Sequence, residues 1–261
     1  MAETNEQPVV IPDEQDSAST TASVSESIFN YRCENGRTYH AYKDGKYVLP
    51  NDERENERLD LQHNLFLLTF GDKLGLAPPC YPDAKVNHVL DLGTGTGIWA
   101  MDFADEHPEA ELSKLNPNGY LELQEADLTI KSDDGTVKPD NALLKCLKLL
   151  QEASERFGRP YVDIPALVDL MTEIGFVDVK IERFRWPSNS WPKDKKYKEL
   201  GTWCYENFSS GLEAITMAAL TRGHGWSVED TTVFLMDVRK TMGDRKVHAY
   251  WPIYSIYGRK P

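Results

Sequence analysis

The stretch VLDLGTGTGIWA, residues 89–100, decides the fold class of this chain. An apolar run ends in Asp91, and three glycines then alternate with two threonines: Gly93, Thr94, Gly95, Thr96 and Gly97. Glycine lets the backbone turn sharply after a strand and lie close against a ligand. A helix that starts there presents unpaired N–H groups and its positive dipole end to the loop. The stretch therefore predicts a strand–loop–helix unit whose loop binds an anionic group.

The spacing of the glycines narrows the choice of ligand. It is GxGxG, and Ile98 stands where the dinucleotide fingerprint has its third glycine. The Asp91 carboxylate would repel a pyrophosphate but would attract an ammonium group. A ligand with an amino group and a carboxylate satisfies both ends of the loop, and the methionine part of S-adenosylmethionine is such a ligand.

The DLGTGTG sequence resembles motif I of the class I, seven-stranded S-adenosylmethionine-dependent methyltransferases. The segments NDERENERLDLQHNLFLLTFGDKLGLAPP, NPNGYLELQEADLTIKSDDG and AYWPIYSIYGRKP are similar to the fungal LaeA-like (UMTA-type) subgroup, which is associated with secondary metabolism, and the resemblance covers Glu34 to Pro261. It implies a Rossmann-like α/β fold, S-adenosylmethionine as cofactor, and a small molecule or a protein as methyl acceptor. The cofactor-binding residues implied are Asp91, Gly93, Thr94, Gly95, Thr96 and Gly97.

The sequence departs from the family pattern after the glycine loop. The pattern requires an acid about 20 residues after the glycines to bind the ribose, and SKLNPNGY at 113–120 contains none. Glu109 and Glu111 come earlier, where we expect the link from the helix to the next strand. We therefore expect an internal deletion of roughly 60 residues, by the size of βαβ units, with its junction near Glu111 to Ser113. Strands two to four would be absent, leaving strands near residues 90, 123, 180 and 253.

Four functional hypotheses follow. The first is an active methyltransferase, and the second is a catalytically defective, methyltransferase-like protein that acts through partners. The third is a chain that does not fold stably alone, since net stability is a small difference between large terms. A nicotinamide-dependent dehydrogenase is disfavoured by Ile98 and by the missing ribose acid. No catalytic residue is predicted, because methyl transfer mainly needs alignment of the acceptor.

The remaining elements follow from periodicity and turn signals. We expect a hairpin in 34–52, with Tyr39 and Tyr42 in one strand, Tyr47 and Val48 in the next, and an Asp44–Gly45 turn. Helices are expected at about 52–74, 97–106, 140–157 and 165–174, and strands at 86–92, 119–130 and 177–184. Residues 187–246 read as a helical lid with helices at 195–220 and after a Ser227–Asp230 capping box. Pro252 in the last strand, 249–257, suggests an edge or a bulge.

Composition sets outer bounds on function. The net charge of −13 argues against nucleic acid or anionic lipid as a partner. Residues 1–30 read as a disordered acidic tail, and 31–261 as the methyltransferase-like domain. The absence of an apolar run of membrane-spanning length or a secretory signal, together with four separated cysteines, predicts a soluble protein of the cytoplasm or nucleus. No metal site and no particular oligomeric state are predicted. Weaker site candidates, each more often structural, are Tyr39, His40, Tyr42, Gln124, Glu125, His224 and the aromatic side chains of the lid, Trp203, Tyr205, Phe208, Trp226 and Phe234.

Overall fold

The computed structural model describes residues 30–41, 47–81, 83–112 and 115–261. The chain divides into two compact units, Met1–Asp52 and Glu53–Pro261. In the first, strand β1 (Arg32–Glu34) pairs antiparallel with β2 (Arg37–Tyr39). Asn35 and Gly36 form the turn with φ of 51° and 73°, as a two-residue hairpin loop of type I′ requires.

This hairpin corrects the predicted one. Tyr39 is in a strand as expected, but Tyr47 and Val48 are in none. Asn-Gly is a strong type I′ signal, and it places the turn of this hairpin before Tyr39. The predicted turn at Asp44–Gly45 and the predicted tail up to residue 29 lie outside the described residues.

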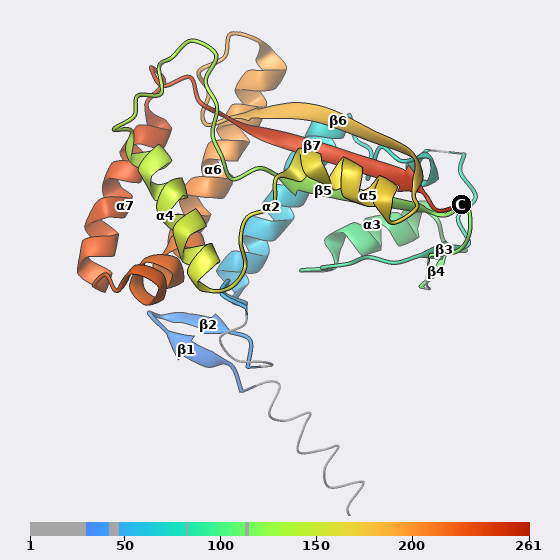
Figure 1. Ribbon diagram of the computed structural model, residues 1–261, viewed down its shortest axis with the longest axis horizontal. Coiled ribbons are helices and arrows are strands. Elements are labelled where there is room, and N and C mark those ends of the chain that lie inside the picture. Colours follow the sequence, from blue (N-terminus) through green and yellow to red (C-terminus); the bar gives the residue numbers. More distant parts are fainter. Residues whose placement is uncertain (1–29, 42–46, 82, 113–114) are drawn as a thin grey trace, which may run out of the picture. The chain divides into compact units, whose positions relative to one another are not determined.

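The larger unit is built on a three-stranded antiparallel sheet (Figure 1). Strand β7 (Tyr250–Arg259) lies between β5 (Tyr120–Ala126) and β6 (Val177–Pro187). Helix α5 (Leu167–Glu173), which follows a 3-10 turn at Ile164–Ala166, covers one face.

The other face of this sheet packs on α2 (Glu53–Phe70). The ring centroids of Phe66 in α2 and Trp186 in β6 lie 5.0 Å apart. The Trp186 indole also donates a 2.7 Å hydrogen bond to the Thr69 hydroxyl, so the buried N–H is satisfied.

Pro252 does not form the predicted bulge, because it pairs in register with Arg185 of β6. Strand β7 is the central strand of the sheet, but β5 pairs with it only from Ile253 onward, so Pro252 lies at a local edge, as predicted. The reason is local. The Pro252 carbonyl accepts from Asp127 N, so the proline nitrogen faces the same side of the strand. Strand β5 ends at Ala126 on that side, so the missing N–H removes no ladder bond.

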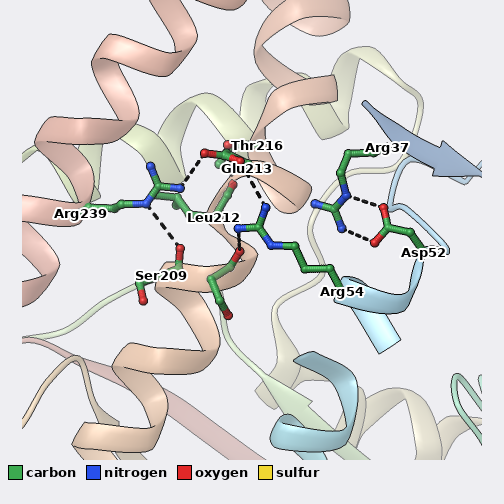
Figure 2. Close-up of polar contacts among 9 residues, drawn as sticks. Arg37, Asp52, Arg54, Ser209, Leu212, Glu213, Thr216 and Arg239 are labelled. Atoms are coloured by element: carbon green, nitrogen blue, oxygen red, sulfur yellow. Dashed lines mark hydrogen bonds and ion pairs between the residues drawn. The ribbon is translucent and has the colours of Figure 1, made fainter. Parts of the chain in front are cut away.

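The main core lies among helices at one end of the sheet. These are α4 (Ala142–Arg156), α6 (Lys195–Ala218), the π-helical turn η3 (Ala219–Gly223) and α7 (Val228–Gly243). They confirm the helices predicted at 140–157, at 195–220 and after Ser227, and the Ser227 hydroxyl accepts from Asp230 N at 2.9 Å. Figure 2 shows Glu213 of α6 between Arg54 of α2 and Arg239 of α7, at 3.6 Å and 2.9 Å.

A second, smaller sheet carries the glycine loop. Strand β3 (His88–Val89) pairs in parallel with β4 (Glu111–Leu112), and α3 (Ile98–Glu106) connects them. The β3–α3–β4 segment has an apolar cluster of its own, centred on the buried side chains of Leu74, Val86 and Phe103. A 3-10 turn, η1 (Pro78–Cys80), precedes it.

The parallel pair overturns the expectation that no strand lies between the first helix and β5. Glu111 is in a strand rather than in a link, because the crossover through α3 brings it beside His88. Among the described residues β3 pairs with β4 and not with β5, so the β3–β4 pair and the three-stranded sheet are separate.

Candidate functional site

The glycine loop runs from Asp91 to Gly97, between β3 and α3. Gly93, Gly95 and Gly97 have φ of +86°, +57° and +83°, which residues other than glycine rarely adopt. No atom lies within 4 Å of the position that a Cβ on Gly93 would occupy, whereas one on Gly95 would lie 3.6 Å from Leu59 Cδ1. The loop is therefore backed by α2 near Gly95 and open over Gly93.

Asp91 enters the loop with one carboxylate oxygen unsatisfied. Its Oδ2 atom is buried and has no hydrogen-bond partner. Burial raises the pKa of this carboxyl, and a hydrogen bond from the Thr94 side chain opposes the shift. A buried carboxylate oxygen without a partner is costly, and a cationic group placed against it would remove that cost. This fits the amine end of an amino-acid ligand.

The first turn of α3 completes the loop. Gly97 caps the helix in the left-handed conformation without a side-chain hydrogen bond. The Ile98 amide has only a long contact of 3.4 Å to the Thr96 hydroxyl. Amides of a first helical turn have no partner within the helix. They present partial positive charge to a carboxylate.

Helix α2 contacts the glycine loop and α3 from one side. The Thr96 hydroxyl donates to Asp60 Oδ1 at 2.6 Å, and His63 Nε2 lies 2.8 Å from Asp102 Oδ2. The Trp99 indole donates to the Leu74 carbonyl at 2.9 Å. The sequence interpretation missed these contacts. Asp60 and His63, three residues apart in a helix with many apolar residues, are the signal that could have indicated them.

Several fungal proteins are similar to this chain in sequence. Methyltransferase pytC of Aspergillus terreus is 32% identical over 304 aligned positions, which cover 94% of this chain and 93% of that protein. Probable methyltransferase tdiE of Emericella nidulans is 33% identical, covering 92% of each. The chain belongs to the LaeA-like methyltransferases. Secondary metabolism regulator LAE1 of Cochliobolus heterostrophus is 30% identical, with 87% of this chain and 94% of that protein covered. No protein-family model matches the chain.

This LaeA-like methyltransferase departs from the family pattern at the ribose side of its loop. Strand β4 is short, and the sequence from Ser113 to Tyr120 contains neither Asp nor Glu. The acid that would bind the ribose hydroxyls has no counterpart there. The residues present thus fit the amino-acid end of S-adenosylmethionine and do not fit its ribose.

Two cavities in the described part of this methyltransferase are lined by residues outside the glycine loop. A surface hollow of about 480 Å³ is lined by Gly225, Trp226, Ser227, Asp230, Val233 and Phe234. A narrow cavity of about 20 Å³ lies in the main core, next to Phe208 and Trp251. The loop itself lies largely at the surface, since the residues from Leu92 to Gly95 are exposed.

The weaker site candidates have structural contacts. His224 Nε2 lies 2.8 Å from the Leu149 carbonyl of α4, and Gln124 Nε2 donates to the Leu74 carbonyl at 2.8 Å. Glu125 is exposed as a residue, and partial desolvation of its carboxyl group raises the pKa of that group. Within the N-terminal unit, His40 packs edge-on against Tyr31 and Tyr47.

Among the residues that the structure describes, no three His, Cys, Asp or Glu side chains gather where they could hold a metal ion. In the same residues, no helix combines the length and the apolar character needed to cross a membrane.

Proposed function

We propose that this chain binds S-adenosylmethionine by its amino-acid end at the glycine loop and passes the methyl group to a small molecule or a protein in secondary metabolism. The observation that carries the proposal is the unsatisfied Asp91 oxygen at the entrance of a loop that leads into the first turn of α3. Membership in the LaeA-like methyltransferases supports the reaction class.

Each part of the loop has a role in the proposal. Asp91 binds the amine by charge and hydrogen bonding. The amides of Ile98 and its neighbours in the first turn of α3 bind the carboxylate. The bound donor supplies an activated methyl group, whose bond to sulfur breaks as the bond to the acceptor atom forms. The protein contributes orientation and exclusion of water, and helices α6 and α7 provide the lid in this proposal.

We further propose that the segment between Leu112 and Tyr120 has lost strands three and four with their helices. The 94% of the chain that aligns with pytC is about 245 of 261 residues, whereas the alignment spans 304 positions, so about 60 positions of pytC have no counterpart here. The alignment with tdiE leaves about the same number. The division between the β3–β4 pair and the three-stranded sheet supports placing the loss there.

A second candidate is a methyltransferase-like protein that acts through partners without turnover. The missing ribose acid favours it, since fewer contacts must offset the cost of ordering the donor. We expect donor affinity to be weak in either case, and turnover separates the two candidates.

Calorimetric titration with S-adenosylmethionine tests the proposal. We expect binding by the wild type and a loss of about tenfold or more in Asp91→Asn, which keeps the shape of the side chain but removes its charge. Asp105→Asn, on the exposed side of α3, is the matched control and should bind as the wild type does. Absence of heat at millimolar donor would overturn the proposal. Binding without methyl transfer to any acceptor in an extract would favour the second candidate.

A further inference from the structure

The glycine loop has little support from its own sheet. Strands β3 and β4 have two residues each, and the three-stranded sheet is separate from them. In a wide parallel sheet, neighbouring strands on both sides fix the position of such a loop. In this protein, contacts from α2 fix it instead. We propose that Asp60 is a positioning residue, which holds the loop in the geometry that binds the donor. This inference rests on the proposed function.

A short chain of polar contacts leads from Asp60 to the ligand side of the loop. Asp60 Oδ1 accepts the Thr96 hydroxyl proton at 2.6 Å, and the same hydroxyl oxygen lies 3.4 Å from Ile98 N. Because Asp60 fixes the direction of the hydroxyl proton, the lone pairs of Thr96 face the first turn of α3. The amide that faces the ligand carboxylate in the proposed function is thus oriented from α2.

A second contact stops α3 from pivoting about the first. His63 Nε2 lies 2.8 Å from Asp102 Oδ2, one turn further along α2 and within α3. The His63 side chain is 9% exposed, so this pair is shielded on the α2 side. Leu59 Cδ1 fills the space behind Gly95. One face of α2 therefore supports both the loop and α3, through Leu59, Asp60 and His63.

Paired substitutions test the role of Asp60 through donor affinity. We expect Thr96→Val and Asp60→Leu each to raise the dissociation constant of S-adenosylmethionine about three- to tenfold, the effect of one lost hydrogen bond. Asp60→Asn and Thr96→Ser keep an acceptor and a hydroxyl, so both should stay within about twofold of the wild type. The double variant Asp60→Leu/Thr96→Val should bind no more weakly than the worse single variant, because both remove one interaction.

Thr172→Val is the control for the loss of a threonine hydroxyl. Thr172 is exposed in α5, and its hydroxyl donates to the Val168 carbonyl of the same helix at 2.8 Å. We expect the donor affinity of this variant to remain within about twofold of the wild type. An equal loss of donor affinity in Thr172→Val and Thr96→Val would overturn the proposal, since the loss would then not depend on the contact with Asp60.

Hydrogen exchange of the unliganded chain separates this proposal from the proposed function. We expect Asp60→Leu to speed exchange at the amides of residues 93–99 and to leave β5, β6 and β7 unchanged. If the wild type binds no donor, the proposed function fails, and the exchange result alone decides the role of Asp60. Unchanged exchange at residues 93–99, or faster exchange throughout the three-stranded sheet, would overturn the positioning role.

Discussion

Glu122 of β5 accepts a 2.7 Å hydrogen bond from the hydroxyl of Ser255 in β7, on the face of the sheet opposite α5. The same carboxylate accepts from the Leu76 and Ala77 amides, with a shortest distance of 2.8 Å. One side chain therefore joins two strands to the segment that leads from α2 toward the glycine loop. Its position explains how the small parallel pair is attached to the main sheet.

Replacement of Glu122 by Gln should destabilise the protein. One oxygen then has to satisfy three donors, and we expect a loss of about 1–3 kcal/mol in the free energy of unfolding, measured by urea denaturation. Glu125→Gln, in the same strand, is the matched control. Burial raises the pKa of Glu125, so removing its charge should leave stability unchanged or slightly higher. Equal losses in the two variants would contradict the assignment.

The buried indole of Trp186 gives a second prediction. Its N–H donates to the Thr69 hydroxyl at 2.7 Å. Thr69→Val keeps the shape of the side chain but leaves the N–H without an acceptor, which should cost about 1–3 kcal/mol. Thr69→Ser keeps the hydroxyl and should lose less. Thermal unfolding of the two variants distinguishes them, and a Thr69→Val protein as stable as Thr69→Ser would show that the hydrogen bond contributes nothing.

Acid stability should depend on Asp134. The hydrogen bond from His248 and then those from Thr136 hold the pKa of this carboxyl well below its ordinary value. A group with a lowered pKa in the folded state stabilises the fold above its unfolded pKa of about 3.9 and loses that contribution as the pH falls.

Urea denaturation between about pH 2 and pH 5 measures this effect. The free energy of unfolding should fall more steeply with decreasing pH in the wild type than in Asp134→Asn. His248→Gln removes the largest cause of the shift and should also flatten the profile. If the free energy of unfolding varied with pH in the same way in all three proteins, Asp134 would not contribute to the acid dependence.

Donor binding should begin to weaken at a higher pH than it would if Asp91 had the ordinary pKa of an aspartate. In the proposed function the Asp91 carboxylate must be charged, and burial raises its pKa. Affinity for S-adenosylmethionine should be complete well above that pKa and should fall as the pH decreases through it. Calorimetric titrations at several pH values measure this dependence. Asp91→Asn should show a weaker affinity that no longer varies with pH in this range, and a pH-dependent Asn variant would identify another titrating group.

The sequence by itself determined the local features of this protein. The three glycines specify a strand–loop–helix unit because each occupies a positive φ. Apolar periodicity and the Ser227 cap placed α4, α6 and α7 to within a few residues, since helix signals are local. The resemblance in the glycine loop and its flanks led to the family.

Only the tertiary structure decided which strands pair. Pro252 is tolerated in a central strand because β5 ends beside it. Glu111 lies in a strand because the α3 crossover returns it to His88. The bond from Thr96 to Asp60 joins residues 36 positions apart. Each of these features depends on a contact with a segment that is distant in the sequence. A local pattern of residues does not specify which distant segment will lie beside it.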